Sequence, residues 1–261
     1  MDFKFDGTKL SSKGYIIYHE GLLEENRPTS TMMYDVMKAS FSDVSYKVSY
    51  NYESNYTVTF NIMKDPCTYD NTFLTENDVS EMTSWLVRKQ HKTFRYINDD
   101  GTDNPTWYKV QNTVEKIITG DHVVGLAVTV NSHAPYGFRT SPTTTWSGNS
   151  QQFTVVSDEE GYIYPMMTIT CNAAGNLTIV NSREDNRITQ INNVVSGEVI
   201  TIIGVDTLQI STSVSGHNLA TDFNYVFPRF SVTYDDKVNT LTTNLSSDKE
   251  LKYYGIRKVG L

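Results

Sequence analysis

Apolar and polar residues alternate most regularly in two neighbouring segments near the N-terminus. Each segment places four apolar residues on one face of a strand: Val44, Tyr46, Val48 and Tyr50 in the first, and Tyr56, Val58, Phe60 and Ile62 in the second. With Tyr52 to Asn55 as the turn, the spacing predicts a long antiparallel hairpin over Val44–Met63. So long an aromatic face needs a surface to pack on, which either the same domain or another molecule supplies.

The segment His122–Phe138 has the pattern of a strand that is buried on both faces. One face carries bulky residues and the other smaller ones: Val124, Leu126, Val128 and Val130, against Val123, Gly125, Ala127 and Thr129. A large side chain is therefore expected over the small face. The strand has to end before Pro135, because proline cannot continue a central strand. We predict that Pro135 and Tyr136 form the junction between a domain over residues 1–138 and a second domain over residues 139–261.

A helical pattern occurs over Thr75–Gln90. Thr75 can cap the helix with Asp78 in the capping-box position, and four apolar residues form one stripe along it: Val79, Met82, Trp85 and Leu86. Trp85 is the side chain expected to cover the small face of the strand at residues 123–130. Core packing explains this tryptophan better than ligand binding does.

The remaining pattern consists of short strands and turns. Glu20–Thr31 is polar and contains Pro28, which predicts a loop, whereas Met32–Met37 is ambiguous. Arg139–Gln152 is rich in Thr, Ser, Gly and Asn and is predicted to be a linker or an exposed loop. Beyond it, strands recur at the intervals of a β-sandwich, as in Met166–Cys171 and Leu177–Asn181. The predicted fold class is mainly β with one α-helix.

Composition and charge narrow the class of protein. Aromatic residues make up 12% of the 261 residues, with 17 Tyr, which suits sheets that have one solvated face. The net charge of −8 argues against a nucleic-acid-binding surface, although it permits nucleic acid to pass by. The N-terminus lacks an apolar signal core and no run is long enough to span a membrane. Synthesis in a cytoplasm is therefore expected, with Cys67 and Cys171 as free buried thiols.

No catalytic or metal-binding motif is found. The five histidines are scattered, and the acidic clusters fall in turns, where solvation explains them better than a pair of glycosidase carboxylates does. We expect no cofactor and no enzymatic activity. Trp146 lies in a polar segment and is a candidate platform for stacking against a sugar ring.

The order of several short motifs resembles the distal tail protein (Dit) family of long-tailed phages that infect Gram-positive bacteria. The motifs run from the N-terminus to the second half of the chain: Phe3-Lys4-Phe5-Asp6-Gly7, Gly14-Tyr15-Ile16-Ile17, the hairpin, Ser84-Trp85-Leu86, Ala134-Pro135-Tyr136, Pro165-Met166-Met167-Thr168-Ile169, Gly175-Asn176-Leu177-Thr178-Ile179 and Val226-Phe227-Pro228-Arg229-Phe230. Each motif is short, and their order over nearly the whole chain carries the resemblance.

The resemblance implies an N-terminal ring-forming domain and a C-terminal galectin-like β-sandwich. It further implies a homohexameric ring at the tail tip that joins the tail tube protein to tail-associated, fibre or receptor-binding proteins and lets DNA pass without specific binding. In such a ring the hairpin would contact the neighbouring copy. The alternative is a carbohydrate-binding sandwich that recognises host cell-wall glycans through Trp146 or Tyr136. A hydrolase is the third and weakest hypothesis.

Overall fold

The computed structural model describes residues 2–18, 32–38, 44–52, 54–184, 187–204 and 207–258. Over these ranges the chain is mainly β, which confirms the predicted fold class. It forms two compact units, one with the described residues up to Phe138 together with Lys258, the other with Arg139–Arg257. Most of the predicted loop at Glu20–Thr31 lies outside the described residues. None of the described helices is long and apolar enough to span a lipid bilayer.

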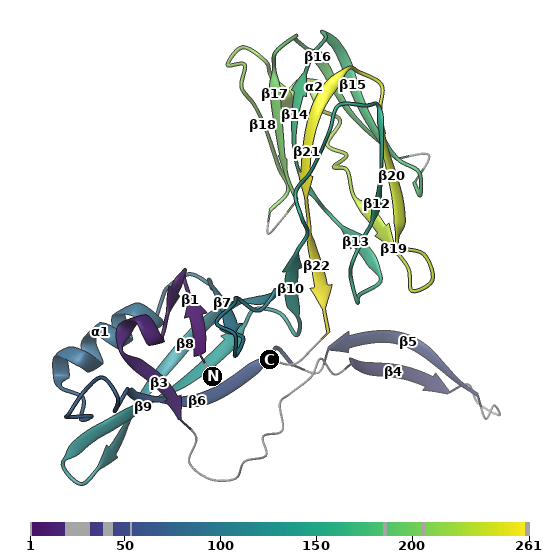
Figure 1. Ribbon diagram of the computed structural model, residues 1–261. Helices are drawn as coiled ribbons and strands as arrows, with labels where there is room; N and C mark the ends of the chain where they lie inside the picture. Colours follow the sequence, from purple (N-terminus) through teal and green to yellow (C-terminus); the bar gives the residue numbers. More distant parts are fainter. Residues whose placement is uncertain are drawn as a thin grey trace. The chain divides into compact units, whose positions relative to one another are not determined.

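The first unit is built on a twisted antiparallel sheet (Figure 1). Seven of its strands follow the order β2-β1-β7-β8-β9-β6-β3. Their bounds are β1 (Asp2–Phe5), β2 (Thr8–Lys9), β3 (Tyr15–Tyr18), β6 (Thr57–Lys64), β7 (Lys92–Ile97), β8 (Thr106–Thr119) and β9 (His122–Ser132), with a 3-10 turn at Ser11–Lys13. The central strand β9 pairs with β8 on one side and with β6 on the other.

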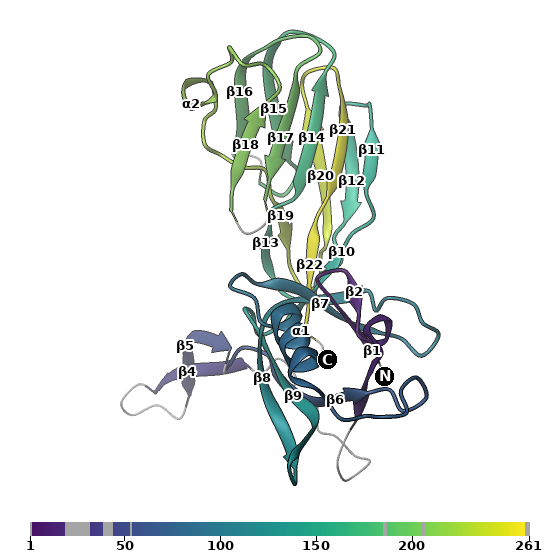
Figure 2. The same ribbon diagram turned by 90° about the vertical axis from the view of Figure 1, so that its left-hand side faces the viewer.

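Helix α1 (Glu76–Leu86) packs against this sheet (Figure 2). The predicted capping box is present: the Thr75 hydroxyl accepts from the Asp78 amide, and the Asp78 carboxylate accepts from the Thr75 amide at 2.7 Å. The apolar stripe is also confirmed, since Met82, Trp85 and Leu86 are buried. The helix ends at Leu86 rather than near Gln90, because Val87 turns to an extended conformation.

The helix lies over the bulky face of β9, and the prediction that it covers the small face is wrong. Val128 pairs with Phe60, whose ring lies 5.2 Å from that of Phe3, and the Phe3 ring stacks 6.0 Å from Trp85. The large residues of the strand thus join the aromatic core. On the opposite face, Thr129 contacts Thr59 through exposed hydroxyl groups. The sheet therefore has one packed face and one largely open face.

The two arms of the predicted hairpin do not pair with each other. Strand β6 pairs with β9 and β3, whereas β5 (Ser45–Tyr52) pairs with β4 (Met32–Lys38), the segment whose pattern was ambiguous. Alternation shows that each arm is a strand, but it does not encode which strand lies beside it. Phe60 and Ile62 are buried beside the helix, and this burial places β6 in the main sheet.

The second unit is a β-sandwich (Figures 1 and 2). One sheet has the order β11-β21-β14-β17-β18 and the other β12-β20-β15-β16. The bounds are β11 (Thr144–Trp146), β12 (Ser150–Thr154), β14 (Met166–Cys171), β15 (Gly175–Asn181), β16 (Ile188–Val194), β17 (Val199–Ile203), β18 (Gln209–Thr212), β20 (Val238–Thr243) and β21 (Ser247–Lys252). Shorter elements are β10 (Gly137–Thr140), β13 (Gly161–Ile163), α2 (Leu219–Asp222), β19 (Phe230–Val232) and β22 (Tyr254–Arg257).

Two expectations for this half and its cysteines need correction. The predicted linker at Arg139–Gln152 contains β11 and the start of β12, because its threonines and glutamines occupy the solvated sides of edge strands. Cys171 is a buried free thiol, as expected, but Cys67 is exposed in the turn after β6.

Candidate interaction surface

Strands β4 and β5 form a two-stranded ribbon, and in the described part of the chain neither pairs with any other strand (Figure 1). Eight large apolar side chains on or directly beside these strands are between 51% and 63% exposed: Met33, Tyr34, Val36, Met37, Val44, Tyr46, Val48 and Tyr50. We call this set the apolar ribbon. The density of exposed aromatic and aliphatic side chains over two short strands is unusual for a solvated surface.

A β-bulge divides the apolar ribbon between two faces. Asp35 pairs with Ser49 and Val36 with Lys47, so that Val48 is the additional residue. The Lys47 ammonium lies 4.4 Å from the Tyr34 ring centroid and 4.3 Å from that of Tyr50, which places these three side chains on one face. Tyr46 and its partner Met37 therefore lie on the other face, and the prediction of a single apolar face is wrong.

A two-stranded ribbon is at most marginally stable by itself in water, and it usually needs a third strand or a packed face. Among the described strands, none pairs with the outer edge of β4 or of β5. Both faces and both edges of this ribbon are thus suited to binding another protein surface.

The structure separates the eight predicted interface residues into two groups. The four in the first segment, Val44, Tyr46, Val48 and Tyr50, belong to the apolar ribbon. Tyr56, Phe60 and Ile62 are buried in the core of the first unit and Val58 packs against it, so these four do not present a surface. Sequence reasoning missed the β4 half of the ribbon, whose signal was the β-prone run of Met, Tyr and Val at residues 32–37.

Tyr136 lies at the base of the ribbon. Its ring contacts that of Tyr52, the last residue of β5, with centroids 5.5 Å apart, and that of Phe138 at 5.6 Å. Pro135 and Tyr136 lie between β9 and β10, where the predicted junction was placed. Tyr136 is therefore committed to an aromatic cluster and is not an open platform for a sugar.

Strand β8 offers an open edge in the same unit. It pairs with β7 through residues 108–110 and also with β10, whereas its pairing with β9 continues to Thr119. Residues 113–119 thus extend beyond the ladder with β7, and Ile118 there is 62% exposed. Such an edge can accept a further strand.

Trp146 lies on β11 at the edge of the sandwich. Its ring meets that of Phe153 edge-on at 5.4 Å and packs against the core of the sandwich. The side chain is half-buried, and its indole Nε1 finds no hydrogen-bond partner among the residues that the structure describes. The ring thus contributes to the core and does not stand free as a stacking platform.

One buried polar cluster has the residue types of an acid-base site. Nδ1 of His217 lies 2.5 Å from Glu198 Oε1, and Nε2 lies 3.5 Å from Asp222 Oδ2. Burial by itself would raise the pKa of Glu198, but hydrogen bonds from Thr212, His217 and the Val195 amide hold this pKa below its usual value. Both side chains are enclosed, so the cluster holds a loop in place and offers no access to a substrate.

The described residues contain no group of three or more His, Cys, Asp or Glu side chains that could hold a metal ion. The apolar ribbon and the open edge of β8 are the features with the clearest capacity to bind a partner.

Comparisons with known proteins assign the chain to a class. A family model described as a phage tail protein N-terminal domain matches residues 1–134, and one described as a phage tail C-terminal domain matches residues 136–253. The chain therefore belongs to this family of phage tail proteins and is a component of a phage tail. No match was found among curated proteins.

Solved structures identify the fold within that class. The chain is similar to the SPP1 Dit (gp 19.1) protein, with a TM-score of 0.65 at 10% identity, over 97% of this chain and 98% of that one. The SPP1 protein is described as a paradigm of the hub adsorption apparatus of phages that infect Gram-positive bacteria. A chain of the phage P2 baseplate matches with a TM-score of 0.55 at 8% identity, over 97% of both chains. The resemblance to the Dit family is thus confirmed for the fold.

Proposed function

We propose that this protein is the structural hub of a phage tail tip, a homohexameric ring that connects the tail tube to the host-adsorption apparatus. The observation that carries the proposal is the apolar ribbon, which leaves eight large side chains exposed on a unit that already has its own core. The membership of a phage tail family and the likeness to the SPP1 hub protein support it.

In this ring the apolar ribbon of one copy packs against the first unit of the next, with the open edge of β8 as the receiving strand. The two surfaces differ, so the contact is heterologous and generates a closed ring when the rotation between copies is one sixth of a turn. The two units then serve as a ring-forming domain and a galectin-like sandwich domain, the roles that the resemblance to the Dit family implies.

The net charge of the chain and its membership of a phage tail family support three further parts of the proposal: passage of DNA, the partners of the ring and a structural role. A net charge of −8 disfavours retention of a polyanion, so DNA passes through the lumen without specific binding. The ring's partners are the tail tube protein on one side and tail-associated, fibre or receptor-binding proteins on the other. The role is structural and not enzymatic, and the chain is made in the host bacterial cytoplasm before assembly into the virion.

The proposal is tested by oligomeric mass and by electron microscopy of negatively stained protein. Val36→Asp and Tyr46→Asp place a charge on each face of the ribbon without touching either core. Each is expected to convert rings with a central hole into smaller species, because an interface core excludes unpaired charge. Tyr234→Asp is the matched control, since Tyr234 is 83% exposed in the second unit and lies outside the ribbon.

Light scattering measures the oligomeric mass in solution and can therefore contradict the proposal. A wild-type chain that stays monomeric at micromolar concentration and forms no rings would remove the proposal. Rings that persist in both ribbon variants would retain the hexamer but reject the ribbon as its contact.

A further inference from the structure

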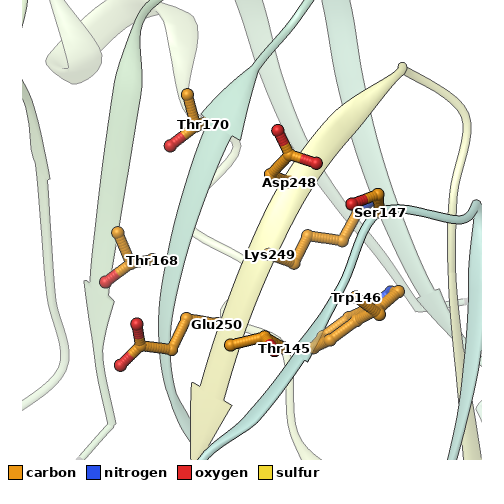
Figure 3. Close-up of a pocket in the computed structure, with 8 residues that line it drawn as sticks. All are labelled: Thr145, Trp146, Ser147, Thr168, Thr170, Asp248, Lys249 and Glu250. Carbon is orange, nitrogen blue, oxygen red and sulfur yellow. The ribbon is translucent and has the colours of Figure 1, made fainter.

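The sandwich carries a polar groove on the outer face of the sheet β11-β21-β14, with a volume of about 340 Å³ (Figure 3). Strand register builds its floor. Thr145 and Thr168 both pair with Glu250, and Thr170 pairs with Asp248, so these side chains form two adjacent rows across three strands. We call this feature the hydroxyl groove. Its volume is within the range of small-ligand sites in proteins, roughly 300–1,000 Å³.

The groove face differs chemically from the inner face of the same strands. Ile169 and Leu251 point into the sandwich core, as does Lys249, whose ammonium donates to the carbonyl oxygens of Gly148 at 3.0 Å and Ser247 at 2.8 Å. Trp146 and Lys249 also line the groove, but the Trp146 ring packs against Phe153 and the Lys249 ammonium is held by these two carbonyl oxygens. The side chains that the three strands leave available in the groove are therefore hydroxyls and carboxylates.

One carboxylate of the groove is fixed and the other is free. Asp248 accepts a hydrogen bond from Ser147 and one from Asn172 Nδ2 at 3.2 Å, and these bonds hold its pKa below the usual value. Glu250, Thr168 and Thr170 make no side-chain hydrogen bond within the described chain. The groove therefore presents one oriented acceptor together with a free carboxylate and free hydroxyls.

Trp146 adds an unused donor to the lining. Its indole Nε1 is buried without a partner, and a buried N–H without an acceptor is destabilising.

We infer that the hydroxyl groove is a binding site for a neutral saccharide. Carboxylates are strong acceptors for sugar hydroxyls, and threonine hydroxyls can both donate and accept, which matches the donor and acceptor pattern of a sugar. Two carboxylates without a cation on the groove face disfavour polyanionic wall polymers. The only aromatic ring among the lining residues, Trp146, is packed against Phe153, so stacking adds little and the site is weak. Many copies on one particle would therefore be needed for firm attachment.

This inference does not depend on the hexameric ring, because all the groove residues lie in the second unit. A chain that forms rings without binding sugars, or binds sugars without forming rings, would separate the two proposals.

Saturation-transfer-difference NMR on the full chain tests the inference. The probes are methyl glucoside, methyl galactoside, N-acetylglucosamine and rhamnose, with tetralysine as a cationic comparator. Glu250→Gln and Thr168→Val are expected to weaken binding of the responding sugar by about tenfold each. Thr242→Val is the matched control, because Thr242 is an exposed strand threonine on the other sheet of the sandwich.

A second measurement avoids dependence on variants. Methyl-labelled threonine spectra of the wild-type chain should show shifts for Thr145, Thr168 and Thr170 during the sugar titration, with Thr242 unchanged. The inference is overturned if no sugar in the panel gives transfer, if the groove variants bind as the wild type does, or if tetralysine alone binds. The last result would assign the groove to a basic partner protein.

Discussion

Gly125→Ala is the most incisive test of how the first unit is packed. Gly125 is buried in β9, and a Cβ built there would lie 2.7 Å from the carbonyl oxygen of Ile62 and 3.1 Å from the Tyr18 hydroxyl. The Ile62 oxygen belongs to the backbone of the neighbouring strand β6, so it cannot move aside as a flexible side chain could. The substitution must therefore displace β6 from β9.

Overpacking of this kind costs about 1–3 kcal/mol of unfolding free energy. For a unit of this size that loss lowers the melting temperature by roughly 3–10 °C. Hydrogen exchange followed by mass spectrometry is the suitable assay, because it assigns the loss to β6, β8 and β9 while the sandwich provides an internal reference. Faster exchange is expected in these strands, with β14 and β17 unchanged.

Ala127→Leu is the control on the same face of β9. Ala127 pairs with Asn61 and Glu115 on the more open side of the sheet, away from the helix. Since the helix covers the opposite face, the added side chain should be tolerated within about 0.5 kcal/mol. A silent Gly125→Ala would refute the close approach of Ile62 and Tyr18 to this glycine. An Ala127→Leu variant as unstable as Gly125→Ala would refute the assignment of the open face of β9.

Two further predictions concern single polar groups. Thr75→Ala removes the hydroxyl that caps α1 and should cost about 1 kcal/mol in a urea titration, whereas Thr75→Ser should retain most of the stability. Glu198 has a lowered pKa in the folded chain, so the unfolded chain binds more protons in the acid range. This group's stabilisation is present above the pKa of an unfolded glutamate and is lost as the pH falls through the lower folded pKa. Urea midpoints of wild type and Glu198→Gln measured from pH 7 to pH 3 should therefore converge at the acid end, and a constant difference would contradict this.

Local sequence patterns were sufficient to predict those helices and strands that depend only on residues close together in the chain. The capping box at Thr75 and Asp78 and the apolar stripe that ends in Leu86 define α1 within one segment. The alternation in Met166–Cys171 defines β14 in the same way. These features depend on periods of 3.6 and 2 residues, which the sequence displays directly.

Residues far apart in the chain decide which strands lie side by side and which face of each strand is buried. The two regular segments at residues 44–51 and 56–63 have similar alternation, yet one is half of an exposed ribbon and the other lies in the core. The bulge at Val48 moved Tyr46 to the face opposite Tyr50, because one extra residue inverts every later side chain of a strand. No local pattern specifies such a bulge.

The candidate sites show the same contrast between what local sequence patterns predict and what long-range strand pairing decides. The sequence by itself determined that the chain is mainly β, where its helix begins, and which motif order it shares with distal tail proteins. Only the tertiary structure decided that β4 and β5 leave apolar side chains on both faces and that Thr145, Thr168 and Glu250 meet across three strands. Burial and strand register are properties of pairs of distant segments, and a single segment's pattern records only that it needs a partner.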